Sequence, residues 1–265
     1  MADLTPEGKE KIRKLLEQAR REIAAEVAST DWERYRQPKL IAEIDYYLRQ
    51  FGEAAVRELK ADLNKQFAEG QAAMDQQIAG QGIQVANFPA ISESALVAMQ
   101  QDLATRISGL TADAVADVQK SLSLGLLGGK TPFETMEAIG RSLDSPGIFA
   151  TITRRAETIV REEFGRTFRK GAQLRMEQAA KHVSGLKKQW VHAGHPARPR
   201  PTHVALHGKI LNIDERFELL NEKTFQVERP LHPKDPVLSA ENSIGCGCQA
   251  RPYKESWGLE LPKAV

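Results

Sequence analysis

Residues 40–79 read LIAEIDYYLRQFGEAAVRELKADLNKQFAEGQAAMDQQIA, and this stretch decides the fold class. Its apolar residues recur every three or four positions with no proline between them, which predicts one helix of about forty residues. The stripe consists of Leu40, Ile44, Tyr47, Leu48, Phe51, Val56, Leu59, Leu63, Phe67, Met74 and Ile78. A helix of this length, about 60 Å, packs lengthwise on a partner helix in the same chain or in another subunit.

Further helices are predicted on both sides of this stretch. Thr5 is an N-cap followed by proline, and the apolar stripe that begins there runs to Val27. Beyond the central helix, Ser92 and Thr111 are the predicted N-caps of two separate helices, and residues 148–181 carry another long helical pattern.

The sequence changes character after Gly185. Prolines cluster, helical periodicity stops, and short runs at 188–191 and 209–211 favour strands. The predicted fold is therefore mainly α, with long amphipathic helices in the N-terminal body and a small α+β C-terminal domain. The predicted segments are long helices in 1–79, a linker in 80–91, a helical body with a basic helix in 92–183, and the His- and Cys-bearing domain in 184–265.

Composition and charge narrow the class of protein. Hydrophobic residues make up 41% and charged residues 27% of the chain, which is typical of globular proteins. No stretch approaches the roughly 20 apolar residues that span a bilayer, and the charged N-terminus lacks a signal-peptide pattern, so we expect a cytosolic protein. The net charge is only +2, but residues 151–210 hold 13 Lys and Arg against four Glu. This basic zone favours an acidic partner.

The helix predicted for 148–181 carries most of that basic zone. Its basic face is either solvated or turned toward phosphates or an acidic protein surface, and binding to DNA there would be nonspecific and sensitive to salt. The candidate residues are Arg154, Arg155, Arg161, Arg166, Arg169, Lys170 and Arg175. The glutamates among them, Glu157, Glu162 and Glu163, are interpreted as partners in ion pairs within the helix.

The C-terminal domain, residues 184–265, is called the tail below. Together with His182 just before it, this domain holds all six histidines and both cysteines. Sulfur and imidazole nitrogen are the ligands that Zn²⁺ prefers, so a structural zinc is one interpretation. The possible ligands are His203, His207, His232, Cys246 and Cys248. In the alternative interpretation, the histidines hydrogen-bond to loop backbone and the cysteines are small buried residues. A disulfide between Cys246 and Cys248 would close a strained ring and is not expected.

Two enzymatic interpretations remain as alternatives. His203 and His207, with Arg200 and Lys209 nearby, could be arranged as a metal-independent nuclease, although no motif fixes that geometry. The fragment 129–131 matches the end of a phosphate-binding loop. However, leucine replaces the first glycine of that motif, so a turn and a helix cap at Thr131 are favoured.

Read in order, the tail residues resemble the C-terminal signature of the phage Mu protein F family of minor head proteins. The resemblance covers roughly residues 95–253, and it includes the helix segment 153–163. The signature residues are Trp190, Arg200, His203, Gly208, Pro230, Cys246 and Cys248. Many members end in Asn-Cys-Arg-Cys, whereas this chain has glycine between its cysteines and its asparagine displaced to Asn242.

The resemblance implies a low-copy structural protein of the virion, not an enzyme. Such proteins lie inside the capsid at the portal vertex, aid head morphogenesis and contact packaged double-stranded DNA. The implied partners are the portal protein and the major capsid or scaffolding protein, which such a protein would bind in the host cytoplasm during assembly. Several copies of the minor head protein would lie around the portal. The rival hypotheses are a nuclease or toxin-like enzyme in the C-terminal domain, and a zinc-stabilised interaction module.

Overall fold

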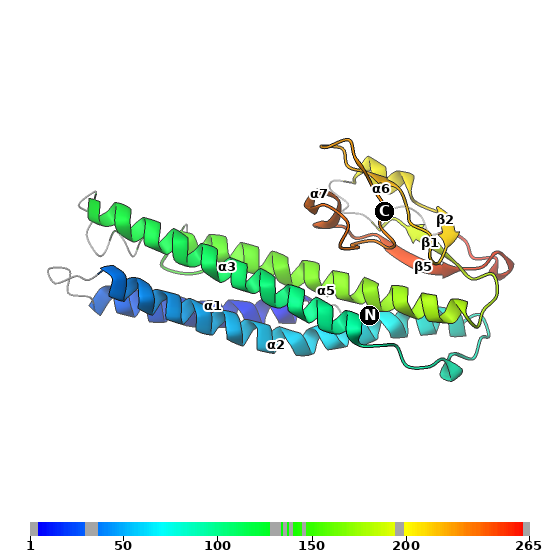
Figure 1. The fold of residues 1–265 in the computed structure, drawn as a ribbon, viewed down its shortest axis with the longest axis horizontal. Coiled ribbons are helices and arrows are strands. Elements are labelled where there is room, and N and C mark those ends of the chain that lie inside the picture. Colours follow the sequence, from blue (N-terminus) through cyan, green and yellow to red (C-terminus); the bar gives the residue numbers. More distant parts are fainter. Residues whose placement is uncertain are drawn as a thin grey trace. The chain divides into compact units, whose positions relative to one another are not determined.

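The computed structural model describes residues 5–29, 37–127, 134, 137, 140–144, 147–193 and 199–261. Its N-terminal part is a bundle of long helices, and its C-terminal part is a small mixed region with antiparallel sheets (Figure 1). The four long helices are α1 (Thr5–Ser29), α2 (Gln37–Ala79), α3 (Ser94–Leu127) and α5 (Ile148–Ala180). This arrangement confirms the predicted fold class.

The chain forms two compact units. The helical unit comprises Asp3–Asp62 and Ala98–Arg161, and the C-terminal unit comprises Leu63–Val97 and Glu162–Val265, apart from residues outside the described ranges. Helices α2, α3 and α5 each contribute residues to both units. The boundaries predicted at residues 79, 91 and 183 remain a prediction. Among the described helices, none combines the length and the apolar character needed to cross a membrane.

The helical unit buries the apolar stripes that the sequence predicts. Residues three or four positions apart lie on the same face of a helix, so each stripe faces inward as a continuous row. On α1 the row is Ile12, Leu16, Ala19, Ile23 and Val27, and on α2 it includes Leu40, Ile44, Leu48, Phe51, Ala55 and Leu59. On α3 and α5 it includes Leu103, Ile107, Leu110, Phe149, Ile152 and Val160.

The prediction of two helices beginning at Ser92 and Thr111 is wrong, because α3 runs without a break from Ser94 to Leu127. The Thr111 hydroxyl donates a hydrogen bond to the carbonyl oxygen of Ser108 (2.8 Å), inside the helix. A threonine can cap a helix or bond back to the preceding turn, and here it does the latter. The phosphate-loop fragment 129–131 and the predicted cap at Thr131 lie outside the described residues.

Two small antiparallel sheets organise the C-terminal unit. The larger sheet has the order β2–β1–β5, with β1 (Lys187–Val191) between β2 (Ile210–Asn212) and β5 (Gln249–Tyr253). Its register pairs Trp190 with Ala250. The second sheet pairs β3 (Leu219–Leu220) with β4 (Val227–Glu228), and the short helices are α6 (Pro201–Ala205) and α7 (Ala240–Ser243). The remaining short elements, η1 (Val85–Asn87) and η2 (Glu255–Trp257), are 3₁₀ turns.

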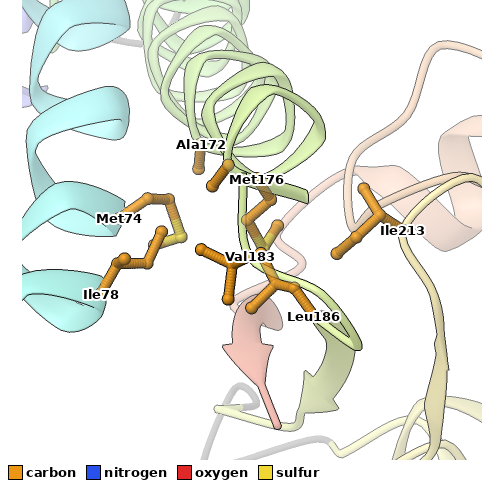
Figure 2. Packing of buried hydrophobic residues seen from close by; sticks show 8 residues of the cluster. Met74, Ile78, Ala172, Met176, Val183, Leu186 and Ile213 are labelled. Carbon is orange, nitrogen blue, oxygen red and sulfur yellow. The ribbon is translucent and has the colours of Figure 1, made fainter. Parts of the chain in front are cut away.

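Within the C-terminal unit, one apolar cluster joins α2 and α5 to the segment that leads into the sheet. Figure 2 shows side chains from α2 facing those of α5 and of the chain that follows it. The buried members are Met74, Ile78, Ala172, Met176, Ala179, Val183, Leu186 and Ile213. Nearby, α2 and α5 approach closely at two glycines, Gly70 and Gly171. The tail is therefore anchored on the ends of two long helices.

Candidate metal centre

Trp190 is the centre of a second core, formed by the tail alone. It is fully buried on the central strand β1, and its ring meets the Phe217 ring edge-on at 4.9 Å between centroids. The His203 ring lies on another side, 6.2 Å from the Trp190 centroid. Both cysteines are buried in the same cluster. A polar group buried in such a place needs a partner, so the surroundings of His203 are informative.

Short elements bring one histidine and two cysteines together. Pro201 begins α6, whose single turn places His203 on its buried side. After α7 the chain turns at Gly245, where φ is +72°, and the next residues present Cys246 and Cys248. The His203 Nδ1 atom lies 3.5 Å from the Cys246 Sγ and 3.6 Å from the Cys248 Sγ. All three ligand atoms lie within 4.8 Å of one another.

A hydrogen-bonded chain behind His203 fixes the orientation of its ring. Asn242 donates from Nδ2 to the Glu228 carboxylate (3.0 Å) and places its Oδ1 3.4 Å from the His203 Nε2. Because an amide oxygen only accepts, the His203 Nε2 must carry the proton. In the neutral form of the ring, the lone pair then lies on Nδ1, facing both sulfurs. An outer hydrogen bond of this kind is typical of histidines that bind metal ions.

Glu228 is itself held as a carboxylate. Burial acts to raise its pKa, but hydrogen bonds from Ser239, Asn221 and Asn242 together lower it. The Asn221 Nδ2 lies 3.0 Å from Glu228 Oε1, and the Ser239 backbone N–H lies 3.2 Å from Oε2. An ionised carboxylate only accepts hydrogen bonds, so it keeps the Asn242 amide in the orientation described above.

The two thiols are unequal. A hydrogen bond from Cys248, aided by the charge of Arg169 and opposed by burial, lowers the pKa of Cys246 to about 4. The hydrogen bond to Cys246, together with burial, raises the pKa of Cys248. Cys246 is therefore the more acidic of the two thiols. The thiolate is the form of cysteine that binds metal ions.

The donor set fits a metal ion that prefers sulfur and nitrogen. Two buried sulfurs and one imidazole nitrogen with a fixed lone pair could bind an ion such as Zn²⁺, which takes four ligands in a tetrahedral arrangement. Three of these ligands would be the residues just described. The structure thus brings together three of the five predicted ligands, with His203 as the histidine of the set.

The two other histidines predicted as ligands lie outside the cluster. The His207 Nδ1 accepts a hydrogen bond from the His192 backbone N–H at 3.0 Å. His232 is buried, and its Nδ1 lies 2.9 Å from the Pro233 carbonyl oxygen. Burial lowers the pKa of His232 to about 4, so the ring is neutral at pH 7. For these two residues, the alternative interpretation of hydrogen bonding to backbone describes the structure.

The basic face predicted on α5 is not one surface. Arg154, Arg155 and Arg161 are exposed in the helical unit, and Arg155 pairs with Asp113 at 2.5 Å. In the C-terminal unit, Lys170 is half-buried. Arg166 pairs with Glu163, Arg175 pairs with Asp75, and Arg169 donates to loop carbonyls. Contacts within the chain thus occupy Arg166, Arg169 and Arg175, which corrects their assignment to an outward-facing surface.

The glutamate interpretation also needs correction. Glu163 pairs with Arg166 within the helix, as predicted. Glu157 instead pairs with Arg13 of α1, and Glu162 pairs with Lys234 of the tail. Sequence spacing shows which side chains share a helix, but it does not show which other segment packs on that face.

The remaining signature residues hold the framework around Trp190. Arg200 donates to the Ile244 carbonyl oxygen (2.6 Å), and the Gly208 N–H donates to the Trp190 carbonyl oxygen (2.8 Å). Gly208 has a φ of +84°, and a Cβ there would lie 2.8 Å from Leu261 Cδ2, so only glycine fits. The Pro230 carbonyl oxygen accepts from the Phe217 N–H at 2.9 Å. These residues serve the fold of the tail.

Comparison with known proteins gives two matches. The sequence model of a family described as "Phage Mu protein F like protein" matches residues 116–251, just over half of the chain. The "Uncharacterized protein YqbB" of Bacillus subtilis (strain 168) is 31% identical over 86 residues, which is 32% of this chain and 27% of that protein. The match thus spans about a quarter of that relative's own length. No solved structure matches this chain.

Proposed function

Because this chain belongs to the Phage Mu protein F like family, a family of bacteriophage head proteins, we propose that it is a structural minor head protein that aids head morphogenesis at the portal vertex. The matched region contains the whole tail signature and the metal-ligand cluster. Family membership is the observation that carries the proposal. Several copies arranged around the portal, inside the capsid, are part of it.

A groove in the helical unit supports docking of the long helices on another protein. It has a volume of about 530 Å³ and lies between α2 and α3, with Gly52, Val56 and Ile107 among its lining residues. Arg49, Arg57 and Lys60 line it against a single acid, Glu53. An apolar groove with a basic rim fits an acidic amphipathic helix. We assign that helix to the portal protein, with the capsid or scaffolding protein as the other possible partner.

Co-purification with the portal protein of the same phage tests the proposal. Deleting residues 1–79 is a poor test, because Met74 and Ile78 belong to the core of the C-terminal unit. The variant Val56→Glu/Arg57→Glu reverses the charge and polarity of the groove and should abolish co-purification. The matched control is Arg21→Glu on the exposed face of α1. Retention of both variants on the portal protein would remove the groove from the proposal.

Contact with packaged DNA is the second component of the proposal. Arg154, Arg155 and Arg161 are exposed on α5, and exposed arginines suit sequence-independent contact with phosphates. Half-buried Lys170 remains a weaker candidate. Arg155 also pairs with Asp113, so this arginine would have to exchange a carboxylate for a phosphate.

Binding of a structural zinc ion by His203, Cys246 and Cys248 is the third component. The ligand atoms are buried and the His203 lone pair faces both sulfurs, which supports a site already arranged for metal. When bound, Zn²⁺ would contribute folding energy by joining α6 to the loop that follows α7. Elemental analysis of purified protein, beside a Cys246→Ser/Cys248→Ser control, tests this. Zinc well below one ion per chain would contradict it.

We also propose that the protein is not an enzyme. Cys246, His203 and Asn242 lie next to one another in space in the order thiol, imidazole and amide, as in the catalytic triad of cysteine hydrolases. All three residues are at most 5% exposed, so a substrate has no access to them. The nuclease interpretation lacks His207, which is engaged elsewhere. Incubation with RNA and DNA beside a His203→Ala control tests the rival: cleavage lost in that variant would favour it.

A further inference from the structure

One face of α5 is occupied by the loop that carries both cysteines. Glu162, Gly165 and Arg169 are spaced at i, i+3 and i+7, so they lie in one row along the helix. This row contacts residues 234–248 of the tail. We call this row the loop seat. It was not apparent from sequence, where the three residues look like part of a charged helix.

Arg169 holds the loop by its main chain on both sides of Gly247. Its Nε donates to the Cys248 carbonyl oxygen at 2.8 Å, and its Nη2 lies 3.5 Å from the Cys246 carbonyl oxygen. Its Nη1 donates to the Gly165 carbonyl oxygen at 2.9 Å, which fixes the guanidinium on its own helix. With both carbonyls drawn toward α5, the intervening backbone is held in the conformation that presents the two sulfurs.

Glu162 holds the beginning of the same loop. Its Oε1 accepts from the Gly245 N–H at 2.9 Å, and its other oxygen pairs with Lys234. Lys234 in turn donates to the Ser243 carbonyl oxygen at 3.3 Å. The ion pair is buried, at 8% and 5% side-chain exposure. A buried charge left without its partner is costly, so this pair fixes the loop firmly.

Two backbone features make room for this arrangement. A Cβ at position 165 would lie 3.1 Å from Arg169 Nη1 and 3.2 Å from Lys234 Cε, so glycine leaves space for both side chains. Lys234 has a φ of +61°, a left-handed conformation that is strained for a non-glycine residue. Such strain persists only where surrounding contacts enforce it.

We propose that the loop seat is a positioning device for the metal centre, so that metal binding at His203, Cys246 and Cys248 and seating of the loop on α5 are one coupled event. This inference rests on the zinc site of the proposed function. Coupling of this kind is reciprocal: a seated loop binds the ion more tightly, and a bound ion holds the loop on the helix by the same factor. Arg169 acts through the loop, because its hydrogen bonds go to main-chain carbonyl oxygens and not to the ligand atoms.

The experiment measures zinc affinity of the full chain by competition with a chromophoric chelator. Arg169→Gln should weaken zinc binding at least tenfold, because it removes the donors to the Cys246 and Cys248 carbonyls. Arg169→Lys keeps the charge without the planar set of donors and should recover only part of the affinity. Lys181→Gln, exposed directly after the end of the same helix, is the matched control and should bind zinc as the wild type does.

A second measurement remains valid if Arg169→Gln does not fold. In the wild-type protein, the Arg169 Nε–H should exchange with solvent at least tenfold more slowly in the zinc-loaded state than after chelation, as followed by nitrogen-15 NMR. Unchanged exchange, or unchanged affinity in Arg169→Gln, overturns the coupling while zinc binding by the wild type stands. A wild-type chain that binds no zinc overturns the proposed metal site, and the coupling with it.

Discussion

Gly70 of α2 and Gly171 of α5 each lie against the backbone of the other helix. A Cβ at Gly70 would lie 2.0 Å from the Phe168 carbonyl oxygen, and a Cβ at Gly171 would lie 2.3 Å from the Phe67 carbonyl oxygen. The two contacts are reciprocal, so this crossing has no space for a side chain from either helix. The closeness of α2 and α5 in the C-terminal unit depends on both glycines.

Gly70→Ala and Gly171→Ala should therefore each destabilise the protein by about 3 kcal/mol or more, because the helices must separate. Gly109→Ala is the control: its Cβ would meet nothing within 4 Å, and alanine should stabilise α3 by about 1 kcal/mol. Denaturant unfolding measures the differences. Equal stabilities for the three variants would show that the crossing tolerates separation.

His232 should make the protein sensitive to acid. Burial lowers its pKa in the folded protein to about 4, against 6.5 for the unaffected side chain. The unfolded chain binds the proton first as pH falls, so stability is lost between pH 6.5 and 4 and retained above 6.5. The loss should reach about 3 kcal/mol at pH 4. The measurement is the difference in unfolding free energy between pH 7 and pH 4.5. In His232→Gln this difference should be smaller than in the wild type by a similar amount. The control, His182→Gln at an exposed position, should behave as the wild type.

Asn242 should support zinc binding without touching the ion. Asn242→Ala removes the acceptor for the His203 Nε2–H and should weaken zinc affinity by roughly 10- to 100-fold. Chelator competition measures the affinity, and Asn64→Ala, at an exposed position on α2, serves as the control. An affinity equal to that of the wild type would mean that ring orientation is set by packing against Trp190.

The exposed arginines of α5 should determine how DNA binding depends on salt. Replacing Arg154, Arg155 and Arg161 with glutamine should reduce the slope of log K against log salt by about 2 to 3, at about 0.9 per lost phosphate contact. Filter retention over a salt series measures the slope, and Arg21→Gln on α1 is the control. Binding that is absent at low salt, or a slope that does not change, would remove DNA from the proposed function.

The sequence predicts the first two long helices well, because each carries its own stripe of buried apolar residues. The stripe of α1 begins at Ile12, and that of α2 ends at Ile78. The prediction fails at Thr111, whose hydroxyl can either cap a helix or bond to the preceding turn, a choice made by tertiary packing. Gly70 and Gly171 also lack a distinctive local signal, because their role appears only when two segments 101 positions apart are placed together.

The metal centre could be predicted only as a set of residue types. His203 is separated from Cys246 by 43 positions, and no local spacing distinguishes it from His207 or His232. The hydrogen bond from Asn242 to Glu228 could not be predicted, because it depends on how β4 and α7 are placed relative to each other. Arg169 was assigned to a basic surface because a helix pattern does not reveal that a loop covers that face. The family resemblance was specific because it used the order of residues along the whole tail.

The strand order of the larger sheet also governs when the tail can fold during synthesis. The central strand β1 pairs with β2 about 20 residues later, but its other neighbour, β5, leaves the ribosome only about 60 residues after β1. Until then, one edge of the strand that carries Trp190 is open to pairing with a foreign chain. Helices α1, α2 and α3 can form long before that point. Within the described part of the chain, the tail therefore keeps an open strand edge long after the first three long helices can form.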